Sequence, residues 1–269
     1  MRKAMKAKTT DPTTLLRDRC LSHFTTLRIP VQPAALDELL TRAEKENLSY
    51  LNFLDRLLGA EAGARHERSV ARRIHDARFP EDKTLEEFNW NFNPTTFKRA
   101  QMEELASGDF IRRRTNLVMV GWSGIGKSHM IQAIGQRACV HGYRVLYQTS
   151  AQLLADLTAS LADKTLPVRL RRYAKPDLLI IDEFGFDKIE RSECPEAAHL
   201  LYKIIASRNQ KRSTALVTNV DFDQWGAYLS DGPLALAFLD RLVEGAIILK
   251  VKGKSYRAEK AKALEDHSG

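Results

Sequence analysis

Asn-Leu-Val-Met-Val-Gly-Trp-Ser-Gly-Ile-Gly-Lys-Ser, residues 116–128, joins a short apolar run to a glycine-rich loop. The apolar residues 117–120 predict a buried strand, and residues 121–128 fit the pattern G-x-x-x-x-G-K-[ST] at every fixed position. The glycines let the backbone turn tightly, so that successive N–H groups point towards one phosphate. A helix that begins near Lys127 directs the positive end of its dipole at the same anion. The stretch therefore predicts a site for a nucleoside triphosphate.

Individual side chains of this loop have predicted roles. Lys127 can reach the β- and γ-phosphates, and the Ser128 hydroxyl can ligate Mg²⁺. A glycine-rich turn with a chance lysine is the structural alternative, and the flanking strand and helix count against it. The residues predicted to contact the nucleotide are Gly121, Trp122, Ser123, Gly124, Ile125, Gly126, Lys127, Ser128 and His129.

The composition excludes several classes of protein. The chain has 269 residues, of which 43% are hydrophobic, and no apolar run reaches the roughly 18 residues that span a membrane. The basic N-terminus precedes no apolar stretch, so a secretory signal is not expected. Widely spaced cysteines, odd in number, fit neither a disulfide framework nor a metal site and indicate a reducing cytoplasm. The net charge of +8 suits a polyanionic partner, nucleic acid first and an anionic membrane surface second.

Strands and helices alternate after the loop, which is typical of a parallel sheet sandwiched by helices. Apolar runs predict further strands at 144–148, 178–181, 214–218 and 246–251. Helical patterns predict helices at 127–140, 151–162, 195–209, 222–229 and 234–243. The expected fold class is therefore α/β. The basic segment at 169–175 is not assigned to a helix or a strand.

The region before the sheet is predicted to be all helical. Apolar residues recur there at helical spacing, interrupted by Pro30 and Pro33. The linker aromatics Phe88, Trp90 and Phe92 either stack on bases or pin the linker onto the core, and the second interpretation is preferred. The expected organisation is a disordered tail at 1–12, a helical domain at 13–79, a linker at 80–95, the nucleotide-binding domain at 96–258 and a flexible tail at 259–269.

The later half of the helical region carries many arginines and few acids. Arg65, Arg68 and Arg72 are spaced i, i+3 and i+7, so they line one side of a helix, and Arg73 stands beside them. A solvated helix face is the plain interpretation, and a surface that follows the phosphates of DNA is the sharper one. The second is favoured, because a nucleotide-driven domain follows in the same chain.

Residues 178–183, Leu-Leu-Ile-Ile-Asp-Glu, predict a buried strand that ends in paired carboxylates. A strand of a parallel sheet places its carboxyl end at the ligand crevice, so Asp182 can hold Mg²⁺ together with Ser128. Glu183 points elsewhere and can polarise an attacking water. A second acid directly after the first favours hydrolysis over phosphoryl transfer to a bound acceptor. The alternative interpretation, which is weaker, is a strand end whose acids are simply solvated.

Polar residues later in the chain are further candidates. Asn219 follows the predicted strand 214–218, where its amide would position the attacking water, and a turn-forming role is the alternative. Arg241 either makes a surface ion pair or reaches the γ-phosphate of a neighbouring subunit as an arginine finger, and spacing within one chain leaves both open. The basic segment 250–257 is either a solvated edge or a DNA contact.

Together these motifs resemble the IstB-like ATP-binding proteins, the AAA+ helper ATPases of IS21-type insertion sequences. The resemblance covers nearly the whole chain, and that family is similar to the DnaC helicase loaders and the initiator DnaA. The phosphate loop is generic to many NTPases, whereas the N-terminal segments and the Ser-Tyr-Arg ending make the match specific. The matching segments are 35–40, 46–50, 78–80, 83–88, 126–129, 177–185, 239–242 and 253–257.

The resemblance implies an AAA+ core with a Mg²⁺-dependent ATPase activity. It implies that Lys127 and Ser128 bind ATP and Mg²⁺, that Asp182 holds the metal, and that Glu183 activates water. It also implies that Asn219 senses the γ-phosphate and that Arg241 acts in trans as the arginine finger. For the whole molecule it implies a bacterial cytoplasmic homo-oligomer, joined through its ATP sites, that assembles on duplex DNA without reading sequence and recruits and stimulates a partner transposase.

The chain departs from the family pattern at some positions. Trp122 stands at a variable loop position that is often proline in relatives. The chain ends soon after Arg257, too early for the helical lid of many AAA+ proteins, so no lid arginine is expected to reach the nucleotide in cis.

Other functions compete with the transposition helper. A replicative helicase loader would use the same motor but prefer single-stranded DNA. A metabolic P-loop kinase would transfer phosphate to a small acceptor, and both Glu183 and the lack of an acceptor-binding motif count against it.

Overall fold

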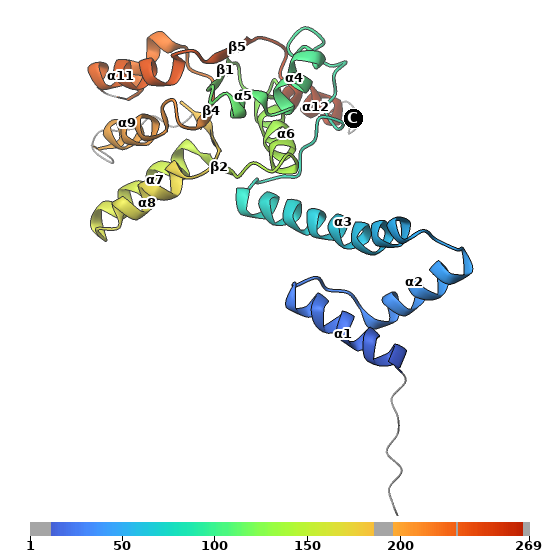
Figure 1. The fold of residues 1–269 in the computed structure, drawn as a ribbon. Helices are drawn as coiled ribbons and strands as arrows, with labels where there is room; N and C mark the ends of the chain where they lie inside the picture. Colours follow the sequence, from blue (N-terminus) through green and yellow to red (C-terminus); the bar gives the residue numbers. More distant parts are fainter. Residues whose placement is uncertain (1–11, 186–195, 230, 266–269) are drawn as a thin grey trace, which may run out of the picture. The chain divides into compact units, whose positions relative to one another are not determined.

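The computed structural model describes residues 12–185, 196–229 and 231–265 (Figure 1). The chain divides into compact units that span Met1–Ser69 and Val70–Gly269. Their boundary lies within helix α3 (Tyr50–Ala77), before the predicted end of the helical domain at residue 79. Several expectations fall outside the described residues: the tail at 1–11, Cys194, the start of the predicted helix at Pro195, and residues 266–269.

The first unit is helical, as predicted, with α1 (Pro12–Thr26), α2 (Pro33–Lys45) and the beginning of α3. Pro33 lies in the first turn of α2, where its missing N–H costs no intrahelical hydrogen bond. At the start of α3 the Ser49 hydroxyl accepts a hydrogen bond from the Asn52 N–H at 3.3 Å. Arg17 of α1 donates to Asp37 of α2 at 2.6 Å, which joins the first helices to each other.

The second unit contains a five-stranded parallel sheet in the order β2-β3-β4-β1-β5. Leu117 of β1 lies opposite Ala215 of β4 on one side and Ile247 of β5 on the other. Parallel neighbours require crossover connections, and the helices between the strands supply them. The strands are β1 (Leu117–Gly121), β2 (Val145–Thr149), β3 (Leu178–Phe184), β4 (Ser213–Thr218) and β5 (Ile247–Val251).

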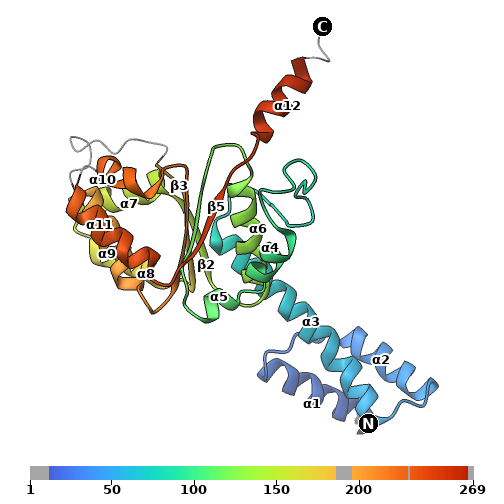
Figure 2. The same cartoon turned by 90° about the horizontal axis from the view of Figure 1, so that it is seen from above.

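Helices cover both faces of this sheet (Figure 2), so the predicted α/β class is confirmed. One face carries α4 (Arg99–Ala106), α5 (Asp109–Arg112) and α6 (Lys127–Val140). The other carries α7 (Ser150–Ala162), α8 (Leu166–Ala174), α9 (Ala197–Arg208), α10 (Trp225–Tyr228) and α11 (Gly232–Val243), with the short 3₁₀ turn η1 (Phe222–Gln224). The basic segment 169–175 belongs largely to α8.

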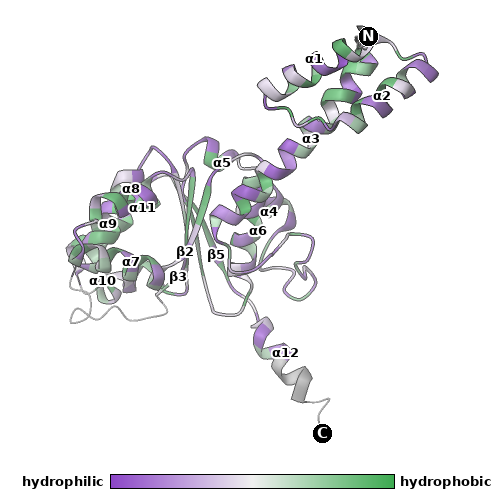
Figure 3. Ribbon diagram, turned by 90° about the horizontal axis from the view of Figure 1, so that it is seen from below, coloured by the Kyte–Doolittle hydropathy of each residue, from purple (hydrophilic) through white to green (hydrophobic). Residues whose placement is uncertain are grey.

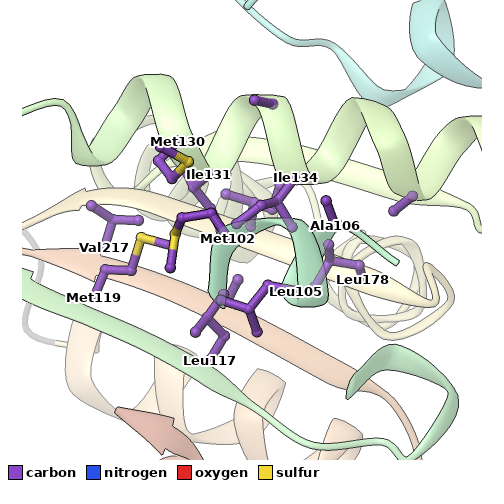
Figure 4. Close-up of a cluster of buried hydrophobic side chains, with 14 of the residues drawn as sticks. Met102, Leu105, Ala106, Leu117, Met119, Met130, Ile131, Ile134, Leu178 and Val217 are labelled. Carbon is purple, nitrogen blue, oxygen red and sulfur yellow. The ribbon is translucent and has the colours of Figure 1, made fainter. Parts of the chain in front are cut away.

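Alternate residues of the inner strands enter different halves of the core, whereas β5 at the edge of the sheet buries only one face. Leu117 and Met119 pack towards α4 and α6, where Leu117 lies beside Leu105 and Met119 beside Met102 (Figure 4), whereas Val118 and Val120 face the opposite helical layer. Figure 3 shows hydrophobic residues along the strands and on the helix surfaces that lie against them. A strand buried on both faces has no polar alternation, which is why the sequence shows continuous apolar runs.

The connection between α3 and α4 packs on the core. Leu85 is buried, and Phe88 and Trp90 pack against the same cluster with their ring centroids 4.9 Å apart. The preferred interpretation of the linker aromatics is therefore confirmed for these rings. Phe92 instead contacts Tyr256, with ring centroids 5.0 Å apart.

The segment predicted to be a flexible tail contains a helix that the sequence did not predict. Helix α12 (Tyr256–Glu265) extends from the end of the sheet domain through most of residues 259–269 and leads away from the sheet (Figure 2). The sequence Ala-Glu-Lys-Ala-Lys-Ala-Leu-Glu at 258–265 has strong helix propensity but no apolar periodicity that would predict a helix. Its first residue is fixed by a hydrogen bond from the Tyr256 N–H to the Gly124 carbonyl at 2.9 Å.

Candidate nucleotide-binding site

A cavity of about 290 Å³ lies at the carboxyl ends of β1, β3 and β4. Residues 123–129 form one wall, and Asp182 and Glu183 at the end of β3 form another. The connection before α4 and the beginning of α12 close the remaining sides. The loop and the acidic pair, separated in the chain, therefore meet in one cavity, as a parallel sheet with this strand order predicts.

The glycines of the loop are held where a side chain does not fit. Gly124 has a φ of 79°, and a Cβ placed there would lie 2.1 Å from the Ser255 hydroxyl. Gly126 has a φ of 98° and caps α6, and its Cβ would meet the Phe88 ring at 2.8 Å. A positive φ and a close neighbour together require glycine at both positions. The loop N–H groups and the N-terminus of α6 then form a cradle suited to phosphate.

Lys127 is buried at the start of α6. Its ammonium group donates to the Gly121 carbonyl at 2.6 Å and the Trp122 carbonyl at 2.7 Å. Burial lowers the pKa of Lys127 to about 8; the Asp182 carboxylate opposes this shift and the Arg257 charge adds to it. The amine is thus a titratable cation whose charge responds to a nearby anion.

Asp182 is buried, and both of its carboxylate oxygens accept hydrogen bonds from the chain. Tyr147 of β2 donates its hydroxyl to Oδ2 at 2.7 Å, and the Glu183 N–H donates to Oδ1 at 2.7 Å. Burial, followed by the Asp182 charge, raises the pKa of Tyr147 above its ordinary value. The carboxylate is therefore fixed in orientation at the edge of the cavity.

Glu183 adopts a backbone conformation that is uncommon for a residue with a side chain. Its φ is 58°, and the register between β3 and β4 shifts between Ile181 and Phe184. The Ser150 hydroxyl donates to the Glu183 carbonyl at 3.1 Å, which helps to hold this bulge. The bulge turns the Glu183 carboxylate away from the buried strand and towards the cavity, where it is exposed. Such strain at a polar residue is typical of functional sites.

The donor set fits a nucleotide-bound Mg²⁺ better than a metal held by protein alone. Within the described ranges, no group of three or more His, Cys, Asp or Glu side chains could hold a metal ion. Mg²⁺ bound with a triphosphate needs only one or two protein ligands, and Ser128 and Asp182 both line the cavity. The cavity also contains a buried acceptor, Gln132 Oε1, which has no hydrogen-bond partner among the described residues.

The structure places other predicted residues outside this cavity. Gly121 and Trp122 contribute carbonyls to Lys127 rather than lining the cavity, and the Trp122 indole is exposed. Asn219 is exposed, one residue beyond the cavity residue Thr218. Arg241 is exposed near the end of α11 and does not reach the cavity of its own chain.

The arginines predicted to bind DNA differ in their surroundings. Arg65 and Arg72 are exposed. Arg68 pairs with Glu61 at 2.6 Å. Arg73 is half-buried and donates to a backbone carbonyl of α6 at 3.3 Å, so part of its hydrogen-bonding capacity is used within the chain.

Residues from the C-terminal segment also line the cavity, which the sequence did not predict. Asn93 clamps the segment by donating to the Lys254 carbonyl at 2.8 Å and accepting from the Lys254 N–H at 3.1 Å. Tyr256 and Arg257 follow directly and line the cavity in cis. That no lid arginine reaches the nucleotide in cis stays a prediction, and the arginine that lines the cavity of its own chain is Arg257, the second residue of α12. The Ser-Tyr-Arg ending was the available signal.

Comparison with known proteins agrees with these motifs. A family model described as IstB-like ATP binding protein matches residues 22–263. The chain is 34% identical over 251 residues to an insertion sequence IS5376 ATP-binding protein of Geobacillus stearothermophilus, covering 93% of this chain and 98% of the relative. It is 36% identical over 229 residues to an insertion sequence IS21 ATP-binding protein of Pseudomonas aeruginosa, covering 85% and 84%.

Solved structures show the same fold at low sequence identity. The crystal structure of DnaI matches with a TM-score of 0.53 and 19% identity over 67% of this chain and 93% of that one. AMPPCP-bound DnaA from Aquifex aeolicus matches with a TM-score of 0.51 and 22% identity, over 70% of this chain and 57% of that one. The second unit therefore has the AAA+ fold.

Among the described helices, none is long and apolar enough to cross a membrane.

Proposed function

Because the chain belongs to the family of IstB-like ATP-binding proteins, we propose that it hydrolyses ATP with Mg²⁺ and uses ATP binding to assemble on duplex DNA and stimulate a partner transposase. The observation that carries the proposal is the single cavity that brings the phosphate loop together with Asp182 and Glu183. A phosphate cradle without the acidic pair would support nucleotide binding alone. A cradle with both carboxylates supports hydrolysis.

In this proposal each side chain acts on the triphosphate from a fixed place. The loop N–H groups and Lys127 hold the β- and γ-phosphates. Ser128 and Asp182 hold Mg²⁺, which would neutralise charge that develops on the phosphate oxygens. Glu183, turned towards the cavity by its bulge, orients the attacking water and takes its proton.

The same cavity also suits a nucleoside. Phe88, Phe92 and Tyr256 supply aromatic surface there, and Arg257 adds a cation from the same chain. The aromatic side chains support binding of the nucleoside base. Arg257 supports binding of the phosphates of the nucleotide in its own subunit. Because Arg257 is already tied to the loop through the Tyr256 N–H, it changes position only if the C-terminal segment moves with it.

Arg241 and Asn219 are proposed to act at the junction between subunits. The exposed Arg241 lies outside the cavity of its own chain, which fits an arginine finger that reaches a neighbour's γ-phosphate. Asn219 is close to the same cavity, beyond Thr218, and would sense the γ-phosphate. ATP would then join subunits into a homo-oligomer.

The DNA contact is proposed to be electrostatic and independent of sequence. The net charge of +8 and the exposed Arg65 and Arg72 support contacts with phosphates. Arg68 and Arg73 contribute less in this proposal, since each already has a partner in the chain. The alternative is a helicase loader, which would prefer single-stranded DNA.

Separating ATP binding from hydrolysis tests the site. The Glu183→Gln protein is expected to retain ATP and lose at least about 100-fold in turnover, because the group that takes the proton is gone. Lys127→Ala is expected to bind ATP much more weakly. Glu103→Gln, an exposed change in α4, is the matched control and keeps full turnover. Hydrolysis by Glu183→Gln at the rate of the unmodified protein would refute the assignment.

A further inference from the structure

Tyr147 is a buried residue of β2 that no motif of the sequence singles out. Its side chain is 6% exposed, and its hydroxyl lies 2.7 Å from Oδ2 of Asp182. The other oxygen of that carboxylate accepts the Glu183 N–H at 2.7 Å. A phenol has one proton to donate, and this one is directed at the carboxylate proposed to hold the metal.

The sheet register brings the pair together. Tyr147 lies opposite Ile180, and Asp182 is two residues further along β3, so its side chain leaves the strand on the same face as that of Ile180. The ring of Phe79 contacts the Tyr147 ring with centroids 6.1 Å apart. Phe79 also packs beneath Gly135, where an added Cβ would meet its ring at 2.8 Å. The Tyr147 side chain is thus held in place by the Phe79 ring and by the neighbouring strand β3, away from solvent.

A carboxylate has about four acceptor positions, two on each oxygen. In Asp182 the Tyr147 hydroxyl occupies a position on one oxygen and the Glu183 N–H a position on the other. These donors on opposite oxygens prevent rotation of the group about its Cβ–Cγ bond. The remaining acceptor positions of the Asp182 carboxylate therefore point in fixed directions at the edge of the cavity.

We infer that Tyr147 is a positioning residue, which orients the Asp182 carboxylate towards a divalent cation held together with the phosphates of ATP. This inference rests on the proposed function of the site. Groups that hydrogen-bond to a metal ligand fix its orientation, and their loss commonly weakens metal affinity by about 10- to 100-fold. Removal of the Tyr147 hydroxyl leaves Asp182 Oδ2 without its donor in a buried position, so the carboxylate is free to turn.

The fold offers a matched control for this hydrogen bond. Tyr173 of α8 is fully buried, and its hydroxyl donates to Oδ2 of Asp156 at 2.7 Å. The bond is chemically the same as that of Tyr147, but neither Tyr173 nor Asp156 lines the cavity. A Tyr→Phe change at either position removes a phenol donor from a carboxylate, although Asp156 is less buried than Asp182 and also pairs with Arg169. Only the change at Tyr147 is expected to affect the metal.

The test measures metal binding without relying on turnover. Mn²⁺ would be titrated into the full-length protein saturated with a non-hydrolysable ATP analogue, and bound metal followed by electron paramagnetic resonance. The proteins are the unmodified chain and Tyr147→Phe, Tyr173→Phe and Asp182→Asn. Binding of a fluorescent ADP analogue in the presence of EDTA reports whether each variant keeps a folded cradle.

Tyr147→Phe is expected to weaken Mn²⁺ binding about 10-fold or more, with metal-free nucleotide binding unchanged and Tyr173→Phe equal to the unmodified protein. Mn²⁺ affinity of Tyr147→Phe equal to or tighter than that of the unmodified protein would overturn the inference. So would a parallel loss of metal-free nucleotide binding, which would show a purely structural role. If Asp182→Asn binds Mn²⁺ as well as the unmodified protein, the proposed metal site itself is wrong.

Discussion

Lys127 shows how a single residue couples the site to pH. Burial lowers the pKa of its amine to about 8, whereas a bound triphosphate would favour the charged form. The lysine also donates to carbonyls of its own loop, so it is already directed along the cradle. The charge of Lys127 therefore changes with pH around 8.

The affinity for ATP is expected to fall as the pH rises above about 8. The complex keeps the Lys127 proton to higher pH than the free protein, so binding takes up a proton in this range and weakens by up to about tenfold per pH unit. Below pH 8 both states carry the proton, and this contribution becomes flat. Titration of a fluorescent ATP analogue between pH 6.5 and 9.5 measures the effect. Lys127→Ala should bind weakly without this slope, and the same slope in that variant would contradict the assignment.

Some site residues could be predicted from sequence and others could not. The loop and the Asp182–Glu183 pair are each contiguous in the chain, so their spacing alone carries the signal. Tyr147 and Arg257 contribute only because strand register and the returning C-terminal segment bring them to the cavity. The strained backbone of Glu183 is likewise a product of the sheet, since nothing in the local sequence demands a positive φ there.

At the scale of elements, apolar runs bounded by turn residues predicted the strands well. Strand β3 continues through its acids to Phe184, because pairing with β4 resumes after the bulge. The highly charged helix α12 was missed, because it has no apolar face to give a period of 3.6. Its place is set by contacts with distant residues: Thr96 donates to the Lys252 carbonyl at 2.7 Å, and Asn93 holds Lys254.

Asn93→Ala should loosen this C-terminal segment. The change removes both hydrogen bonds with Lys254, each worth about 1 kcal/mol, so Arg257 is held less firmly beside the nucleotide. ATP affinity is expected to fall about 5-fold, and trypsin should cut more rapidly after Lys252 and Lys254 even without nucleotide. Asn91→Ala, an exposed change in the same connection, is the control. Unchanged proteolysis in Asn93→Ala would show that the clamp does not hold the segment.

At the scale of the whole molecule, the chain carries a net charge of +8, on which the proposed assembly on DNA depends. The family model matches residues 22–263, and the net charge of +8 suits the polyanionic partner that we propose. Neither composition nor fold identifies which arginines would contact DNA in the proposed assembly. The structure narrows the choice, because it shows which of them already have partners.

Replacing Arg65 and Arg72 together by alanine should weaken duplex binding and lower its salt dependence. Each phosphate contact contributes about 0.9 to the slope of log K against log salt, so the double variant is expected to lose about 2. Arg68→Ala should have a smaller effect, since Glu61 already pairs with Arg68. Fluorescence anisotropy with random-sequence duplex over a salt series measures these slopes. Equal slopes in all three proteins would place the DNA contact elsewhere.

In the proposed function, ATP in this cavity controls assembly on duplex DNA. The most direct measurement is binding of the Glu183→Gln protein to random-sequence duplex and single-stranded DNA, with ATP and with ADP, over a salt series and with assembly size recorded by light scattering. We expect tight, salt-sensitive binding to duplex and growth in size with ATP only. Equal binding with ATP and ADP, a preference for single strands, or no DNA binding would contradict the account.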